Sequence, residues 1–361
     1  MNTTLPLLEP IFLKPRLVPL IWGGDALVRR YGKQGDPAQS IGESWECWDD
    51  NVVREGRFAG SSLAQIRVLL GQALMGRLDP TAPFPLLSKF IDARQALSVQ
   101  VHPDDEYARR VEGKANGKTE CWYVLEASSN AELVLGWTRD VSREEYLKRV
   151  GDGSLEELLR RVPVAPGDVF YLPAGTLHAI GAGIILFELQ QSSDLTYRIF
   201  DWNRLGLDGK PRELHVQKAA DVLDYRAGHD EAINPLTFVD GSADRSLLIV
   251  DSHFLLERVR LGRETFIPEG DRTPLVLQTL QHACTIIVDG KTFPVPPYTS
   301  AIVPAAASCG ISASDERDVS VLLAKAAPDR ERLLERTVQA GIAREDAEEF
   351  FARFGWSGVR A

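Results

Sequence analysis

The chain has 361 residues, of which 44% are hydrophobic and 25% are charged, an ordinary globular profile. This length predicts two units of ordinary domain size. The net charge of −10 at pH 7 argues against a nucleic-acid-binding surface, so an anionic substrate would need Lys and Arg concentrated locally.

The cysteines and the amino terminus predict a cytoplasmic protein. The four cysteines lie far apart without a CxxC pair, which favours reduced thiols over a disulfide framework. The first residues lack a basic region followed by an apolar run, so we expect no signal peptide. The longest apolar runs, such as 179–189, are too short to cross a bilayer, and we expect no membrane partner.

Helical patterns are few in the first half of the chain. The first covers residues 62–75, where Ser62 supplies a cap and leucines and an isoleucine follow at helical spacing. Two short charged helices are predicted at 142–150 and 154–161, because each opens with Ser and has Glu three residues later.

Short strand patterns separated by Gly and Pro make up most of the remaining sequence. Many short strands separated by Gly and Pro indicate a β-sandwich or a β-barrel. The clearest strand patterns lie at 96–102, 120–126, 131–137, 168–172, 184–190 and 195–200.

Three of these segments carry residues suited to one metal site. Gln100 and His102 are two residues apart, so a strand over 96–102 presents both side chains on one face. His102 and His178 supply imidazole nitrogen, and Glu120 supplies carboxylate oxygen. Two histidines and one glutamate match the three protein ligands of a catalytic zinc site, to which Gln100 adds a neutral carbonyl oxygen.

Residues 164–178 predict how a histidine reaches this site. Pro-Gly-Asp makes a turn, an apolar strand follows, and Pro-Ala-Gly turns again before His178, as in a jelly-roll strand pair. A weaker copy of this order occurs at 275–306, but Cys309 stands near the position of the histidine. We therefore expect a second barrel without a metal.

The whole chain thus predicts an all-β dominated fold of two jelly-roll barrels with a few short helices and a helical appendage. The predicted domains are a catalytic unit at 1–235, a degenerate barrel at 236–326 and the appendage at 327–361. Near the end, apolar residues predict two short amphipathic helices broken at Gly341, with a packing role.

Several segments jointly resemble a known family, the type I mannose-6-phosphate isomerases, which are zinc-dependent cupins. The resemblance covers about residues 8–325, in family order, and is strongest to the short bacterial form. It is carried by Ile21–Gly24, Ile41–Glu46, Ser98–Asp105, Gly117–Tyr123, Pro173–Gly181 and Gln190–Arg198.

The resemblance implies two cupin barrels, one Zn²⁺ per chain, and a site in the first barrel. The implied zinc ligands are Gln100, His102, Glu120 and His178, and the implied active-site residues are Lys118, Asp194 and Arg198. For the phosphate, the sequence has no Gly-rich phosphate loop. Our candidates are Ser98 on the metal strand and Lys89 shortly before it.

The implied reaction interconverts D-mannose 6-phosphate and D-fructose 6-phosphate by proton transfer through a cis-enediol. Lys118 and Asp194 are the proton-shuttling candidates, and Arg198 is the clamp for an oxyanion or for the substrate. The alternatives are a regulatory, non-catalytic cupin that binds a sugar phosphate, a metal-dependent cupin oxygenase, and an isomerase of a related aldose phosphate.

Overall fold

The computed structural model describes residues 8–206, 208–228, 231–268, 270, 272–314 and 319–355, which fall into two compact units. The first unit comprises Arg16–Trp45 and Leu87–Ile233. The second comprises the described residues of Met1–Pro15, Glu46–Leu86 and Asn234–Ala361. The last segment of the second unit begins at Asn234, next to the predicted boundary at 235. Its two other segments come earlier in the chain and are separated from the last one by parts of the first unit. The contiguous three-domain division stays a prediction.

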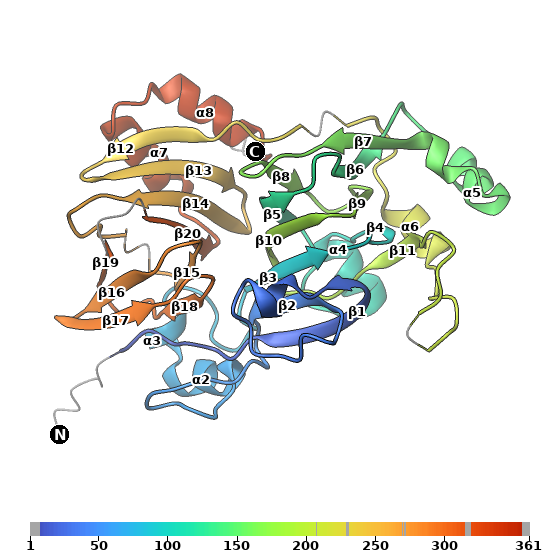
Figure 1. Cartoon of the computed structure of the whole chain (residues 1–361). Coiled ribbons are helices and arrows are strands. Elements are labelled where there is room, and N and C mark those ends of the chain that lie inside the picture. The colour runs from blue at the N-terminus through green and yellow to red at the C-terminus, as the bar shows by residue number, and fades with distance from the viewer. Residues whose placement is uncertain are drawn as a thin grey trace. The chain divides into compact units, whose positions relative to one another are not determined.

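The first unit is built from two antiparallel sheets (Figure 1). One has the order β1 (Arg16–Gly24), β2 (Ile41–Cys47), β3 (Leu86–Ala93), β10 (Ile184–Gln191), β5 (Glu120–Ala127), β8 (Val169–Leu172). The other has the order β11 (Tyr197–Phe200), β4 (Val99–Val101), β9 (His178–Ile180), β6 (Glu132–Trp137), β7 (Leu159–Pro163). Trp122 and Phe170 from the first sheet pack with Leu133 and Ile180 from the second in one buried cluster. This is the predicted jelly-roll architecture.

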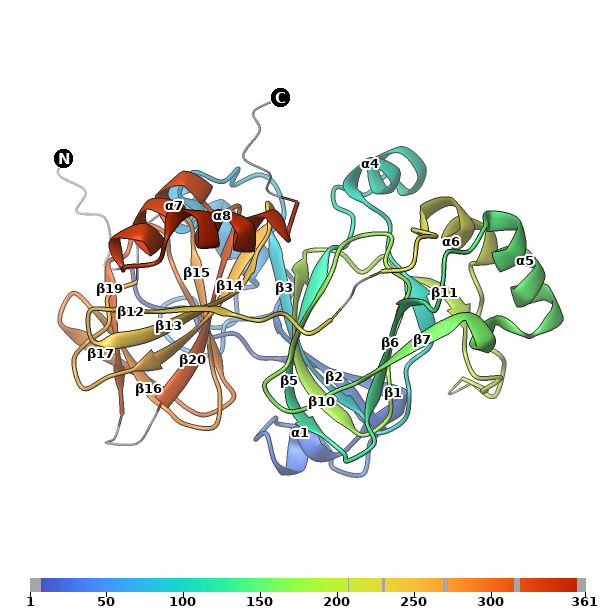
Figure 2. The same ribbon diagram turned by 90° about the horizontal axis from the view of Figure 1, so that it is seen from above.

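The other face of the second sheet is covered by helices α5 (Arg143–Asp152) and α6 (Val216–Val222), which can be followed in Figure 2. Val99 and Val101 of β4 pack there with Tyr146 of α5 and Ala219 of α6. Because side chains alternate along a strand, the intervening Gln100 faces the interior between the sheets. The apolar residues on either side of Gln100 therefore determine which way it points.

Two helix predictions change in the structure. Residues 62–75 form α2 (Leu63–Leu70) and α3 (Gln72–Met75) instead of one helix, because Gly71 between them has φ 51°. The helix at 154–161 is wrong: Leu155–Leu158 form a single 3₁₀ turn, and the following residues pair with β6 as the edge strand β7. By contrast, α5 is confirmed, with Ser142 accepting a hydrogen bond from the amide of Glu145.

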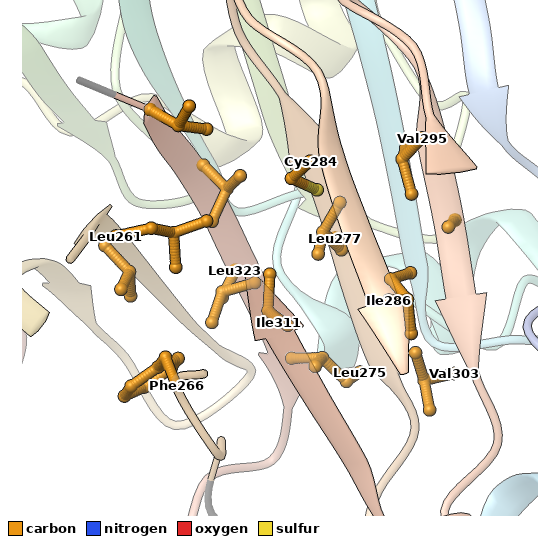
Figure 3. Packing of buried hydrophobic residues seen from close by; sticks show 14 of the residues in the cluster. Leu261, Phe266, Leu275, Leu277, Cys284, Ile286, Val295, Val303, Ile311 and Leu323 are labelled. Carbon is orange, nitrogen blue, oxygen red and sulfur yellow. The ribbon is translucent and has the colours of Figure 1, made fainter. Parts of the chain in front are cut away.

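The large sheet of the second unit repeats the strand order of the first unit's six-stranded sheet, whereas its small sheet has three strands in place of five. Its large sheet runs β12 (Leu236–Asp240), β13 (Ala243–Val250), β14 (Phe254–Leu261), β20 (Val319–Ala326), β15 (Leu275–Thr279), β18 (Ser300–Val303). Its small sheet runs β17 (Lys291–Val295), β16 (Cys284–Val288), β19 (Cys309–Ala313). Figure 3 shows the buried core, in which Leu275, Leu277 and Leu323 lie with Cys284 and Ile286.

Strand register shows what this barrel holds at the positions of the predicted metal site. Strand β8 ends in Leu172 before Pro173, and β18 ends in Val303 before Pro304, which aligns the two. Each pairs with a neighbour in the same way, Leu172 with Glu120 and Val303 with Leu275. The alignment places Leu275, Leu323 and Cys309 where the first unit has Glu120, Glu188 and His178. Carboxylates are thus replaced by leucines that fill the core.

The described end of the chain forms the two predicted helices, α7 (Arg330–Gln339) and α8 (Arg344–Ala352). Gly341 between them has φ 96°, and the buried Phe350 and Phe351 hold α8 in place. The four cysteines are free, as predicted. Among the described residues, no helix has the length and apolar character required to span a membrane.

Candidate metal centre and active site

Three buried side chains converge inside the first unit. His102 follows β4, Glu120 begins β5 and His178 begins β9, so the three come from segments far apart in sequence. Their ligand atoms all lie within 4.8 Å of one another. Glu120 Oε1 lies 3.3 Å from His178 Nε2, and Oε2 lies 3.6 Å from His102 Nε2. Donors bonded tetrahedrally to zinc at about 2.0–2.1 Å would stand at similar separations.

Both imidazoles are oriented by backbone carbonyls. The Nδ1 atom of His102 lies 2.8 Å from the carbonyl oxygen of Leu195, and that of His178 lies 2.9 Å from the carbonyl oxygen of Thr176. A neutral ring that donates through Nδ1 keeps a lone pair on Nε2, and here both Nε2 atoms face Glu120. Burial lowers the pKa of His178 to about 4 and that of His102 well below its usual value, which keeps both rings neutral as metal ligands must be.

Glu120 is fully buried; the ammonium of Lys118 lies 2.6 Å from its Oε2, while its Oε1 has no hydrogen-bond partner within the described part of the chain. Burial and the charge of Glu188 raise the pKa of Glu120. A buried carboxylate oxygen without a hydrogen bond is costly unless a cation meets it, and the unpartnered Oε1 faces Nε2 of His178 at 3.3 Å. The residues therefore fit a divalent metal, and the two imidazoles with one carboxylate fit zinc.

Gln100 lies beside this cluster but presents its nitrogen to it. Gln100 pairs directly with His178 across strands β4 and β9, and its Nε2 lies 3.2 Å from Nε2 of His178. A half-turn of the terminal amide exchanges nitrogen and oxygen without moving the chain. That rotation would bring Oε1 to the position of a fourth ligand, so the role of Gln100 stays a prediction.

Lys118 reaches the same cluster from the loop before β5. Its Nζ lies 2.6 Å from Glu120 Oε2 and 3.2 Å from His102 Nε2, and the side chain is buried. It also lies 4.0 Å from Glu188 Oε1. An ammonium group at this point can deliver a proton to a molecule bound beside the histidines.

Arg198 stands on β11 directly opposite Gln100, and its guanidinium is held at two points. The Nε atom donates to Ser98 Oγ at 3.3 Å, and one terminal nitrogen donates to the carbonyl oxygen of Glu213 at 3.0 Å. Burial, with the nearby charge of Arg212, lowers the pKa of Arg198 from its very high ordinary value, and the group stays charged. The predicted phosphate-binding residue Ser98 is thus a hydrogen-bond partner of Arg198.

Lys89 on β3 is buried among carboxylates. Its Nζ lies 3.1 Å from Glu188 and 3.7 Å from Glu43, and it faces the ring of Trp45 at 4.9 Å. Burial alone would lower the pKa of Lys89, but the two carboxylates outweigh burial and raise this pKa. A phosphate would meet the same carboxylates, so the phosphate role of Lys89 stays a prediction.

Glu188 is a site residue that the sequence reasoning missed. It lies on β10, accepts a hydrogen bond from the indole of Trp122 at 3.0 Å and joins Lys89 to Lys118. Burial would raise its pKa, yet the two lysines lower it. A signal was present, because Glu188 is the one charged residue in the otherwise apolar stretch 184–189.

Asp194 is not brought into the cluster. It lies exposed on the loop before β11, and its side chain makes no hydrogen bond or ion pair with the described residues. Its role in proton transfer remains a prediction.

The fold and the site define a double jelly-roll protein with a candidate zinc centre in one barrel. A family model for the catalytic domain of type I phosphomannose isomerases matches residues 11–148. The mannose-6-phosphate isomerase ManA of Bacillus subtilis is 44% identical over 224 residues, which cover 60% of this chain and 68% of ManA. The chain belongs to the type I phosphomannose isomerases, a family of enzymes.

Solved structures agree with this assignment. The crystal structure of a mannose 6-phosphate isomerase from Bacillus subtilis has a TM-score of 0.79 and 31% identity, covering 88% of this chain and 99% of that one. A zinc-bound mannose 6-phosphate isomerase has a TM-score of 0.69 at 15% identity, covering 89% of this chain and all of that one, which shows the common fold.

Proposed function

We propose that this protein interconverts D-mannose 6-phosphate and D-fructose 6-phosphate and uses one zinc ion per chain. The observation that carries the proposal is the buried carboxylate of Glu120, which faces the Nε2 atoms of two neutral imidazoles and the ammonium of Lys118. The related enzymes named above act on mannose 6-phosphate, which supports this substrate.

His102, Glu120 and His178 would hold the zinc, with Gln100 as a fourth ligand after rotation of its amide. When bound, the metal supplies a Lewis acid that polarises the sugar oxygens at C1 and C2. Two neutral imidazoles and one carboxylate leave a net positive charge on such a site, which suits an anionic sugar phosphate.

The chain's own residues would move the protons. In the first half of the isomerisation a base takes the proton from C2 of the open-chain aldose while O1 gains a proton, which gives a cis-enediol with a C1=C2 double bond. In the second half a proton is placed on C1 while O2 loses its proton, which gives the ketose. Lys118 would exchange the proton carried by the sugar oxygens, because its Nζ lies beside both His102 and Glu120. Asp194 is the second candidate for proton transfer.

Arg198 would balance the negative charge that develops on the substrate. Its guanidinium, fixed by Ser98 and by the carbonyl of Glu213, lies on the same sheet face as Gln100 and His178. A preorganised cation of this kind needs no rearrangement during the reaction. Ser98 would assist by orienting that cation, and the phosphate contacts of Ser98 and Lys89 remain part of the proposal.

A direct assay tests this function. Purified protein is given mannose 6-phosphate, and fructose 6-phosphate is detected by a coupled reaction, before chelation, after chelation and after zinc is restored. We expect turnover that is lost on chelation and recovered with zinc. Tight binding of the sugar phosphate without turnover would instead favour the regulatory cupin, and faster turnover of another aldose phosphate would reassign the substrate.

A further inference from the structure

We infer that Asp105 and Gln191 are positioning residues that fix the backbone of residues 117–119 and, through it, the side chain of Lys118. Both side chains bond to this segment and not to the metal cluster. The inference rests on the proposed function, because it assumes that Lys118 takes part in the reaction.

Three successive backbone amides carry the inference. The amide of Gly117 donates to Asp105 Oδ1 at 2.7 Å, that of Lys118 donates to the carbonyl oxygen of Pro103 at 2.9 Å, and that of Thr119 donates to Gln191 Oε1 at 2.9 Å. Residues 117–119 are buried, so their amides need acceptors from the protein, and the side chains of Asp105 and Gln191 supply two of the three. The conformation of the segment therefore depends on these two side chains.

The two side chains also bind each other. The Nε2 atom of the buried Gln191 donates to Asp105 Oδ1 at 2.9 Å, so this one oxygen accepts two hydrogen bonds. The amide of Gln191 is therefore used at both ends, its oxygen by the Thr119 amide and its nitrogen by a carboxylate. The backbone amide of Gln191 adds a bond to the carbonyl oxygen of Thr119 at 3.1 Å.

Gly117 shows how closely the segment lies against the chain around Asp105. A Cβ atom at Gly117 would stand 2.5 Å from the carbonyl oxygen of Pro103 and 2.6 Å from the amide nitrogen of Asp105. The backbone of residues 117–119 is thus pressed against 103–105 and bonded to it. Since His102 immediately precedes 103–105, the same contacts fix Lys118 relative to a candidate metal ligand.

We call the hydrogen bonds from residues 117–119 to Asp105 and Gln191 the clamp. The expected consequence is a loss of turnover when this clamp is removed. Lys118 lies in contact with Glu120, and small displacements of such a group have large effects on rate. Asp105→Ala removes the acceptor for two bonds, and Gln191→Ala removes the bond to Thr119 together with the support of Asp105. Asp105→Asn removes the negative charge but keeps an oxygen at Oδ1, which separates hydrogen-bond geometry from electrostatics.

The experiment compares the wild-type enzyme with Asp105→Ala, Asp105→Asn, Gln191→Ala and Glu106→Ala. Glu106 is the matched control, because it is exposed on the same helical turn and its side chain makes no hydrogen bond within the described residues. We measure kcat and KM for mannose 6-phosphate, zinc content, and amide hydrogen exchange of peptides covering 116–120.

We expect kcat to fall by about 10- to 100-fold in Asp105→Ala and Gln191→Ala, with KM and zinc content near wild type and exchange of 116–120 faster. Asp105→Asn should stay within about threefold of wild type in both kcat and exchange, as should Glu106→Ala. Unchanged exchange in both Ala variants would overturn the clamp, and so would an Asn variant as impaired as the Ala variant. A wild-type enzyme that is inactive while exchange still responds would count against the proposed function and not against the clamp.

Discussion

Arg198 lies directly opposite Gln100 across the ladder between β11 and β4. On its other side, Gln100 lies opposite His178 of β9, so the three residues form one row across the sheet. Directly opposite residues on antiparallel strands share a sheet face, with Cβ atoms about 4.5–5.5 Å apart. Strand register, and not the length of a flexible loop, thus places Arg198 next to the candidate ligand Gln100 on one face of the sheet.

The first prediction concerns this guanidinium. Arg198→Ala should lower kcat by about 10²- to 10³-fold, the usual effect of removing one group that stabilises transition-state charge. Arg198→Lys should recover little of this loss, because the donors of a compact ammonium radiate from one atom and cannot reproduce the planar fork that reaches Ser98 and Glu213. Turnover of mannose 6-phosphate and zinc content are measured together.

The control is Arg29→Ala, which removes an exposed arginine that pairs with Asp25 on the surface. We expect it to leave turnover unchanged. Normal turnover in Arg198→Ala would make Arg198 peripheral, and loss of zinc in that variant would show that its effect is structural.

The second prediction concerns the metal ligands. His102→Ala, Glu120→Ala and His178→Ala should each lower zinc affinity strongly, because each removes a bond to the ion. Elemental analysis after dialysis against zinc-buffered solution should give about one zinc per wild-type chain and far less in the variants. His282→Ala is the control for removing an imidazole outside the site. One zinc retained in all three ligand variants would show that the ion binds elsewhere.

Much of this site is predictable because its signals are local. Gln100 and His102 are two residues apart, and the period of a strand alone places them on one face. The two turns on either side of the strand before His178 are predicted by Pro and Gly, whose backbone preferences act locally. The assignments of Arg198 and Lys118, by contrast, came from the family resemblance and not from spacing.

What could not be predicted depends on long-range register. Nothing in residues 184–191 says that β10 will place Glu188 between Lys89 and Lys118, since that requires knowing which strands become neighbours. The helix wrongly predicted at 154–161 fails for a related reason. Its Ser and Glu favour a helix locally, but pairing of Leu159–Pro163 with β6 outweighs that weak preference.

The third prediction concerns acid stability and the attachment of α7. Asp240 Oδ2 accepts hydrogen bonds from Arg245 at 2.8 Å and from Arg336 of α7 at 2.6 and 2.9 Å. Burial would raise the pKa of Asp240, but these bonds outweigh burial and lower it. Because the folded-state pKa is depressed, the stabilisation is complete above the unfolded value of about 3.9 and is lost as pH falls through the folded value.

Asp240→Asn should therefore lower the free energy of unfolding by about 1–3 kcal/mol at pH 7, the usual size of hydrogen bonds to a charged group. The difference from wild type should shrink between pH 5 and pH 2. Urea denaturation across that range checks both points. Asp244→Asn removes an exposed ion pair with Arg260 and should cost under about 1 kcal/mol. A difference for Asp240→Asn that does not change with pH would mean that the carboxylate charge contributes nothing.

The last prediction separates the two barrels. In the second unit Leu277 is fully buried between strands, and Cys309 stands at the position that corresponds to His178. Leu277→Ala should destabilise the protein by about 2–5 kcal/mol, the cost of a buried Leu→Ala change. Cys309→Ala should cost far less, because Cys309 is only partly buried and the substitution removes a single sulfur.

Neither change should alter zinc content or the KM for mannose 6-phosphate, because Leu275 and Leu323 occupy the places of Glu120 and Glu188 and cannot bind a cation. Folding is followed by urea denaturation and zinc by elemental analysis of the same preparations. Cys284→Ala, which removes a buried thiol from the same core, serves as the control for loss of sulfur outside the position of His178. Loss of zinc on changing Cys309 alone, with Cys284→Ala unaffected, would show that the second barrel contributes a metal ligand after all.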